Sequence, residues 1–389
     1  MERTKINQLN ENIGKKVLLK GWIHESRDQS KIKFILLRDI SGVVQLVVKE
    51  NTKDIFSTIT KIPKESVISI EGTVKEANIS DREVSEKKVE IIVEKYEVLS
   101  EADKLPIPVV EGKGIVTDLS KRLDFRWIDL RKPKNALIFK IQTTMEMAMR
   151  KYWIKEGFME IHSPKLMCSP SETGAELFPV IYFDKEAFLA QSPQFYKQMA
   201  MASGFEKIFE VGPVFRANPS HTVRHDTEFT SMDVEISWVT SQEEVMKSEE
   251  ELLAFAIQEV KDLHGKEIKE VFGVDIQVPK LPFPRMSLKE AKDLIKATGK
   301  EVSYEEDLNP EEEKLTAQLV KEKFSHDFVF VTEFPWRIKP FYHMRKETDP
   351  SVTKGFDLLW NGLEVTTGAQ REHRYDVLVK QAKDKKLSL

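Results

Sequence analysis

The sequence is poor in cysteine and in long apolar runs. Its 389 residues contain one cysteine, Cys168, which excludes a disulfide within the chain and a zinc site built from several thiolates. No run approaches the roughly 18 apolar residues that cross a bilayer, and the start, MERTKINQLN, lacks the apolar core of a signal peptide. We therefore expect no membrane partner and a reducing, cytoplasmic setting.

The sequence also lacks an excess of positive charge and a glycine-rich phosphate loop. Its formal net charge is −4, so a nucleic-acid partner would have to be bound by local basic and aromatic patches. Neither a GxxxxGK[ST] loop nor a GxGxxG after a strand occurs, so a nucleotide must be held by side chains. Apolar residues make up 40% and charged residues 32%, which is typical of a globular protein, and the length favours two domains.

Residues 1–103 contain five short β-rich segments broken by turn residues, with a helical stretch at 53–60. This pattern suits a closed barrel of the OB type, although another small barrel or sandwich would look the same. The predicted strands are 16–23, 34–38, 43–48, 67–74 and 89–93.

Residues 104–132 are predicted to link this barrel to a second domain, 133–389. The linker begins with the proline- and glycine-rich run LPIPVVEGKG and ends with RLDFRWIDLR, which is dense in arginine and aspartate. The second domain mixes strands that look antiparallel with scattered helices, a pattern of the α+β class rather than of a doubly wound sheet.

Within the second domain, apolar residues at helical spacing predict a helix from Ala136 that stops at Gly157. Ser241 and Glu244 predict a capping box for a helix that ends near Leu263. The charge-rich residues that follow predict a helical insertion. The other predicted elements are helices at 194–202, 265–325 (the insertion) and 377–386, and strands at 158–162, 207–216, 228–238, 328–332, 356–360 and 363–367.

The loop between two of these strands, FRANPSHTVRHDTEF at 215–229, is unusually basic. Arg216 could fork onto a phosphate, and Arg224 with His225 could neutralise a more distal phosphate. Phe229 offers a flat face to a purine. A solvated basic hairpin is the plainer interpretation of such a loop.

The run at 215–229 resembles motif 2 of class II aminoacyl-tRNA synthetases almost position by position. FMEIHSPK at 158–165 looks like motif 1, QSPQFYKQ at 191–198 like the amino-acid pocket of aspartyl enzymes, and EVTTGAQREHR at 364–374 like their late substrate-binding strand. RLDFRWIDLR matches their hinge. Together, in family order, these segments resemble archaeal-type aspartyl-tRNA synthetases, which join aspartate to tRNA-Asp with ATP and Mg²⁺.

Two departures from the family pattern stand out. Asn218 occupies a position where most members have a glutamate that serves the adenine or the tRNA 3′ end. Motif 3, a glycine-rich strand and helix carrying an ATP-binding arginine, is expected after the helix at 377–386, and the sequence ends at Leu389 without it. We expect impaired adenylate formation from a chain without that motif.

The resemblance implies a set of site residues. Three carry catalysis: Arg216, Glu364 and Arg371. The aspartate site comprises Glu172, Gln194, Phe195, Tyr196, Lys197, Arg216, Thr367 and Arg371. The ATP site comprises Arg216, Ala217, Asn218, Arg224, His225, Asp226, Phe229 and Glu364. The magnesium ligands are Glu364, Thr367 and Asp357.

The chemistry expected at such a site explains these residue types. The α-carboxylate of aspartate attacks the α-phosphorus of ATP and is already ionised at pH 7, so positioning and charge neutralisation replace a general base. By resemblance, Glu172 takes the α-ammonium, whereas Lys197 and Arg371 face the side-chain carboxylate. Asp233 and Glu235 would orient the basic side chains or be purely structural.

The barrel carries the residues that match anticodon contacts in the family. Phe34 would stack on a base and Gln45 would hydrogen-bond it, with Arg27 and Lys33 on phosphates. Without the family match, Phe34 would be taken for a core residue. His24, two residues after the Gly-Trp tryptophan, resembles relaxed enzymes that also charge tRNA-Asn.

The resemblance also implies a homodimer through the strand at 158–164, and it leaves three rivals. Asparaginyl-tRNA synthetases lack a lysine in the Lys197 context. Asparagine synthetases on the same catalytic fold lack an anticodon barrel. A tRNA-binding protein without catalysis stays open because motif 3 does not appear.

Overall fold

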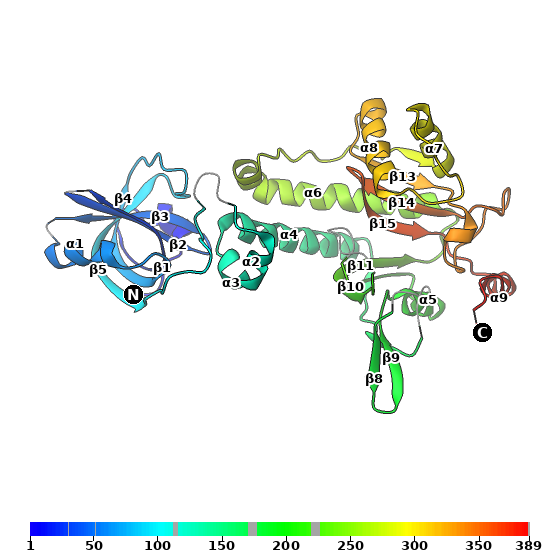
Figure 1. Cartoon of the computed structure of the whole chain (residues 1–389), viewed down its shortest axis with the longest axis horizontal. Helices are drawn as coiled ribbons and strands as arrows, with labels where there is room; N and C mark the ends of the chain where they lie inside the picture. The colour runs from blue at the N-terminus through cyan, green and yellow to red at the C-terminus, as the bar shows by residue number, and fades with distance from the viewer. Residues whose placement is uncertain (30, 51, 112–115, 170–176, 219–225, 388–389) are drawn as a thin grey trace. The chain divides into compact units, whose positions relative to one another are not determined.

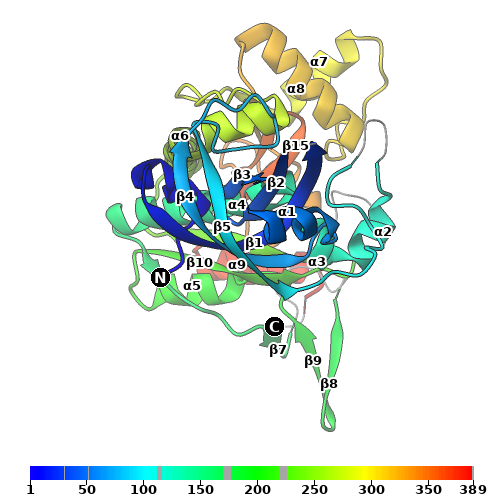
Figure 2. The same cartoon turned by 90° about the vertical axis from the view of Figure 1, so that its left-hand side faces the viewer.

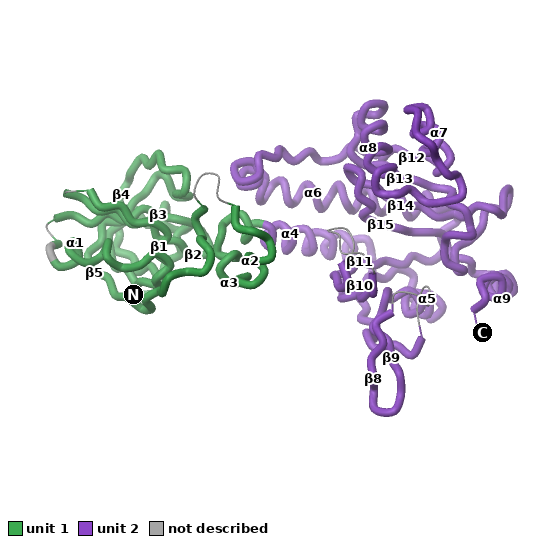
Figure 3. Tube along the Cα trace, in the orientation of Figure 1, with its two compact units in different colours: residues 1–137 green, residues 138–389 purple. Residues whose placement is uncertain are grey.

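The computed structural model describes residues 1–29, 31–50, 52–111, 116–169, 177–218 and 226–387. The chain divides into two compact units, residues 1–137 and 138–389 (Figure 3). No helix of the described residues is long and apolar enough to cross a membrane.

The first unit contains a closed five-stranded barrel in the order β1-β2-β3-β5-β4 (Figure 2). The strands are β1 (Lys16–Gln29), β2 (Ile32–Asp39), β3 (Gly42–Lys49), β4 (Val67–Glu76) and β5 (Val89–Ser100). Helix α1 (Lys53–Thr58) and the 3-10 turn Ile59–Lys61 lie between β3 and β4, and another 3-10 turn, Ile6–Asn12, precedes β1. The predicted OB-type barrel is thus confirmed.

The barrel closes on an aliphatic core supplied by inward-facing residues of every strand, such as Leu19, Ile35, Leu46, Ile70 and Ile91. Alternation of apolar and polar residues along each strand puts these side chains on one face. A Cβ at Gly21 would lie 2.3 Å from the carbonyl oxygen of Arg38. Glycine is therefore required where β1 and β2 approach each other.

Two short helices, α2 (Leu119–Asp124) and α3 (Arg126–Asp129), follow the barrel in the same unit. The buried carboxylate of Asp129 accepts hydrogen bonds from Arg122 and Arg126, and Lys132 lies 3.3 Å away. This cluster explains the density of arginine and aspartate in RLDFRWIDLR, because a buried carboxylate needs cationic partners.

Among the described residues of the second unit, the strands form three sheets, with helices beside them (Figure 1). One sheet has the order β11-β10-β6, the second β12-β13-β14-β15 and the third β7-β9-β8. The strands are β6 (Met159–Glu160), β7 (Leu166–Met167), β8 (Pro179–Tyr182), β9 (Lys185–Leu189), β10 (Lys207–Phe215), β11 (Glu228–Ile236), β12 (Arg285–Ser287), β13 (Phe328–Thr332), β14 (Gly355–Trp360) and β15 (Leu363–Ala369).

Helices pack on these sheets through apolar side chains. Helix α6 buries Leu253 and Ile257 against Phe328, Phe330 and Phe356 of the second sheet. The helices are α4 (Pro133–Lys155), which runs from the first unit into the second, α5 (Gln194–Ala202), α6 (Gln242–Phe272), α7 (Leu288–Ala297), α8 (Pro310–Phe324) and α9 (Tyr375–Asp384), with a 3-10 turn at Trp336–Ile338.

Several predicted elements need correction. The strand predicted at 158–162 is only β6, Met159–Glu160, and it pairs parallel to β10. The region 265–325 is not purely helical, because β12 pairs with β13 in the second sheet. The predicted capping box is wrong in detail. The Ser241 hydroxyl accepts from the N–H of Glu243, whereas Glu244 accepts from Thr240.

The helix that begins there also extends further than predicted. It continues to Phe272 because its apolar positions continue, with Ile268 buried, and it ends at Gly273, which adopts a φ of 71°. A positive φ is readily adopted by glycine and is a common helix terminator.

Candidate functional site

The β10–β11 hairpin forms the floor of the candidate site. Its register places Glu210 opposite Asp233, Gly212 opposite Ser231, and Ile208 opposite Glu235. Because paired residues point to the same face and side chains alternate along a strand, these six residues share one face. Helix α5 packs over this hairpin and carries Gln194 and Lys197 one helical turn apart, hence on one side of the helix.

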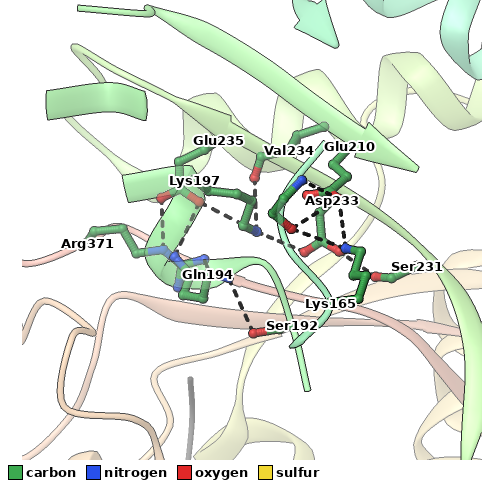
Figure 4. Close-up of polar contacts among 11 residues, drawn as sticks. Lys165, Ser192, Gln194, Lys197, Glu210, Ser231, Asp233, Val234, Glu235 and Arg371 are labelled. Carbon is green, nitrogen blue, oxygen red and sulfur yellow. Dashed lines mark hydrogen bonds and ion pairs between the residues drawn. The ribbon is translucent and has the colours of Figure 1, made fainter. Parts of the chain in front are cut away.

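Lys197 is held between two acidic residues of β11 (Figure 4). Its Nζ lies 2.8 Å from Asp233 Oδ1 and 3.6 Å from Glu235 Oε2. Burial opposes the charge of Asp233, but the ammonium of Lys197 outweighs it and holds the pKa of that carboxyl below its ordinary value. The Ser231 hydroxyl donates to the other oxygen of Asp233 at 2.5 Å. Two carboxylates of β11 therefore fix the position of the lysine side chain.

Arg371, just beyond β15, completes this network from the opposite side (Figure 4). Its Nε donates to Glu235 Oε1 at 3.1 Å, and its Nη2 donates to Gln194 Oε1 at 3.0 Å. Gln194 Nε2 in turn donates to Glu235 at 3.4 Å. Three segments far apart in the sequence thus bring two cations and two carboxylates together.

A second charged cluster adjoins this network on the same hairpin face. Glu210 Oε1 accepts from the N–H and the hydroxyl of Ser163, at 2.9 and 3.1 Å, and from Lys165 Nζ at 2.7 Å. The sequence prediction did not single out these residues. The signal that could have found them is the strand alternation, which puts Glu210 two residues from Gly212 and on the same face as Asp233.

Phe195 and Tyr196 lie half-buried on α5, between Gln194 and Lys197 in sequence. Consecutive helical positions point in different directions. The contacts that hold the network together, in the part of the chain that the structure describes, come from Gln194 and Lys197 rather than from these two aromatic residues.

The predicted nucleotide residues lie at the end of the hairpin where the connecting segment joins β10 to β11. Arg216 follows β10, and its guanidinium lies 5.5 Å from the centre of the Phe229 ring on β11, so the two side chains adjoin. Ala217 and Asn218 are half-buried, and Asn218 donates to the carbonyl of the exposed Asp226 at 3.1 Å. Glu172, Arg224 and His225 lie outside the described residues.

The predicted magnesium ligands adjoin one another on β14 and β15. Thr367 Oγ1 donates to Asp357 Oδ1 at 2.5 Å. Lys339 Nζ, from the segment after the 3-10 turn, lies 2.7 Å from Asp357 Oδ2. Burial and then the charge of Asp357 raise the pKa of Glu364 to about 8. Two carboxylates crowded in this way favour an added cation.

The donor set fits magnesium. It consists of hard oxygens, and one or two carboxylates completed by substrate phosphates are the usual arrangement for this ion. Among the described residues no group of three or more His, Cys, Asp or Glu side chains is arranged to hold a metal by itself. A magnesium ion here would therefore take its remaining ligands from water or from the phosphates of a nucleotide.

The predicted anticodon residues lie on the barrel surface with mixed exposure. Phe34 and Gln45 are half-buried, and Gln45 donates to Glu90 at 3.1 Å. Arg27 is exposed and pairs with Asp81 at 2.8 Å. Lys33 is buried, with its ammonium 2.9 Å from Asp28 and 3.1 Å from Thr60. In this conformation Lys33 does not offer its charge to a phosphate.

His24 is buried rather than exposed. Its Nδ1 lies 2.7 Å from Arg38 Nη1, and its Nε2 lies 3.5 Å from Glu83. Burial, then the positive charge of Arg38, lowers the pKa of His24 to about 4. The imidazole is neutral at pH 7, so His24 influences the barrel surface through Arg38 and Glu83 rather than as a charge.

Comparison with known proteins relates both units to established families. Residues 118–388 match the family "tRNA synthetases class II (D, K and N)", and residues 17–99 match "OB-fold nucleic acid binding domain". The chain is 45% identical over 382 residues to the Aspartate–tRNA(Asp/Asn) ligase of Methanopyrus kandleri, covering 97% of this chain and 85% of that protein. It is 42% identical over 377 residues to the Aspartate–tRNA(Asp) ligase of Pyrococcus abyssi, covering 96% and 84%.

Solved structures give the same assignment. The asparaginyl-tRNA synthetase from Pyrococcus horikoshii complexed with asparaginyl-adenylate superposes with a TM-score of 0.90 at 33% identity, over 100% of this chain and 88% of that one. A putative aspartyl-tRNA synthetase from Leishmania major gives 0.89 at 30% identity, over 100% and 85%. With the barrel, the hairpin site and these matches in place, the chain belongs to the class II tRNA synthetases of the aspartate, lysine and asparagine group.

Proposed function

We propose that this protein is an aspartate–tRNA ligase, which activates L-aspartate with ATP and transfers it to the 3′ end of tRNA-Asp. The main structural support for this proposal is the network of ion pairs among Lys197, Arg371, Asp233 and Glu235. The curated relatives at 42–45% identity are aspartate ligases, which favours aspartate over the asparagine bound by one structural neighbour.

The charge balance of this pocket supports an anionic side chain. The carboxylate of aspartate would place a negative charge beside Lys197 and Arg371, whereas the amide of asparagine would bring none. Asparagine would lose the attraction between that carboxylate and the two cations, which otherwise pair only with Asp233 and Glu235 among the described residues. Selection then follows from the cations rather than from the size of the side chain.

We propose that Arg216 binds the α-phosphate and the reacting carboxylate, and that the purine stacks on Phe229. Arg216 and Arg371 would hold the two carboxylates of aspartate at opposite ends of the molecule, so that one is fixed while the other attacks. Since the nucleophile is already ionised, this orientation is the main contribution of the protein. Glu172, Arg224 and His225 complete the proposal from sequence alone.

Asp357, Glu364 and Thr367 would hold magnesium with the phosphates. A bound ion would neutralise charge on the polyphosphate. The pKa of Glu364 is raised to about 8. Its carboxyl group would therefore have to lose a proton in order to bind the ion.

We propose a division of labour along the chain: residues 1–103 read the anticodon, 104–132 form the hinge, and 133–389 activate aspartate. Phe34, Gln45 and Arg27 would contact RNA directly. His24, through Arg38 and Glu83, would relax the reading of the third anticodon base, so that tRNA-Asn is also charged. The M. kandleri relative has that dual name and the P. abyssi relative does not.

We further propose a homodimer in a cytoplasmic setting. On one side of helix α4 the apolar residues Phe139, Met147 and Ile154 are exposed, and the outer strand β6 exposes Met159. Exposed apolar patches of this kind mark interaction surfaces. A second copy would cover them.

The test is ATP–pyrophosphate exchange with each amino acid, followed by aminoacylation of tRNA-Asp and tRNA-Asn transcripts. Exchange that depends on aspartate and is far weaker with asparagine is the expected result. A preference for asparagine would favour the asparaginyl alternative, and tRNA binding without any exchange would favour a non-catalytic tRNA-binding protein. Aspartylation confined to tRNA-Asp would reject the role given to His24.

A further inference from the structure

Two carboxylates face each other across the hairpin that forms the pocket floor. Glu210 on β10 and Asp233 on β11 are directly opposite in the register and lie on the same face. Opposed like charges destabilise an antiparallel pair. The arrangement is therefore maintained only if each carboxylate has its own cation.

The two cations come from different segments of the chain. Lys197 of α5 lies 2.8 Å from Asp233, and Lys165, from the segment that follows β6, lies 2.7 Å from Glu210 (Figure 4). Ser163 adds two hydrogen bonds to the same oxygen of Glu210. The floor thus contains two parallel ion pairs, only one of which, Lys197–Asp233, belongs to the proposed aspartate pocket.

Glu210 depends strongly on Lys165. Its side chain is 2% exposed, and its second oxygen, Oε2, is buried with no hydrogen-bond partner among the described residues. A buried carboxylate that is only half satisfied is costly and needs a nearby positive charge. Lys165 is the cation that contacts it in the described part of the chain.

The position of Lys165 suits this role. Its Cε and Nζ lie 3.4 Å from the point where a Cβ on Gly212 would stand, so the lysine stem crosses the hairpin beside the strand. Its side chain is 25% exposed, whereas that of Lys197 is 5% exposed. Lys165 therefore contacts Glu210 from the more solvent-exposed side, whereas Lys197 contacts its acidic partners from helix α5.

We propose that Lys165 is a positioning residue for aspartate recognition, which neutralises Glu210 so that Lys197 stays aligned on Asp233 and the substrate carboxylate. This inference rests on the proposed function and adds a residue that contacts no substrate. Without Lys165, the negative charge of Glu210 would act on the neighbouring Lys197–Asp233 pair. The lysine that selects aspartate would then be drawn out of alignment.

The variants Lys165→Met, Glu210→Gln and Lys165→Met/Glu210→Gln test this proposal by aspartate-dependent exchange. Lys165→Met is expected to raise the KM for aspartate by about 10- to 100-fold, the range typical of residues that orient a ligand-binding group, with little change in the KM for ATP. The double variant, which removes both charges, is expected to recover most of that loss. Lys165→Arg should retain near-normal KM.

Lys185→Met, on the exposed strand β9, is the matched control and should be silent. An unchanged KM for aspartate in Lys165→Met, or a double variant as impaired as Lys165→Met, would overturn the inference. If Lys165→Met does not fold, the double variant decides, because it carries no unpaired charge. The exchange is measured with a protein that carries motif 3, and failure of its wild-type form to respond to aspartate would instead reject the proposed function.

Discussion

Lys339 and Asp357 form a buried ion pair at the predicted metal site, with Nζ and Oδ2 2.7 Å apart. Although burial opposes the ammonium charge, Asp357 and then Asp307 outweigh it and raise the pKa of Lys339. The lysine therefore supplies the positive charge that the buried carboxylate of Asp357 needs.

Replacing Lys339 by methionine should make the fold depend on divalent cations. Breaking a buried pair leaves an uncompensated charge and costs about 3–5 kcal/mol, and magnesium with ATP should restore part of this loss by binding the freed carboxylates. Thermal unfolding with and without Mg²⁺ and ATP measures the effect. Equal stability of Lys339→Met and wild type without ligand would contradict this assignment.

Lys197→Ala should impair aspartate selection far more than ATP binding. Its ammonium lies between Asp233 and Glu235. Removing one preorganised charge contact from an active site typically lowers the reaction rate by a factor on the order of 10² to 10³. Aspartate-dependent exchange gives the KM for each substrate. Normal affinity for aspartate would show that Lys197 is structural, and exposed Lys185→Ala is the control.

His24 should make the barrel less stable in mild acid. Its folded pKa, about 4, lies below the ordinary 6.5, so below pH 6.5 the unfolded chain binds the proton more readily. Stability is thus lost as the pH falls from about 6.5 to about 4, by up to roughly 3 kcal/mol. In His24→Gln this part of the pH dependence should vanish. Unfolding of both proteins at pH 4 and 7 provides the comparison.

Charge placed on the exposed apolar face of α4 should separate the proposed dimer. Met147 is 60% exposed, and aspartate there would put an uncompensated carboxylate into a buried interface. Light scattering at micromolar concentration is expected to give a monomer for Met147→Asp. Leu263→Asp, at a solvent-exposed position of α6, is the control. A wild-type monomer would reject the proposed interface.

Much of the fold was predictable because local pattern determines it. The five predicted barrel strands and helix 194–202 each coincide with one of β1–β5 and α5, since alternation and helical periodicity there are strong. Strands β1 and β5 nevertheless continue to Gln29 and Ser100, well beyond the predicted ends at 23 and 93. Short elements such as β7 and β12 were missed. Two or three residues carry too little pattern, and these strands form only because a neighbouring strand pairs with them.

The residues of the site could be predicted from the sequence only where they belong to a recognised motif. The cations Lys197 and Arg371 were expected, but the pairing of Lys165 with Glu210 joins residues 45 apart in the sequence. Lys339 is likewise 18 residues from Asp357. No periodicity links such residues, because their contact depends on how the strands are arranged in the fold.

The segment 161–164 joins β6 directly to Lys165. The N–H of Ile161 donates to Phe209 on β10, and the carbonyl of Lys165 accepts from Ala190. A displacement of β6 would therefore be transmitted to Glu210. If β6 lies in the proposed subunit interface, assembly and aspartate affinity are thermodynamically linked, and each changes the other by the same factor. The apparent affinity for aspartate would then vary with protein concentration, since dilution removes the second copy.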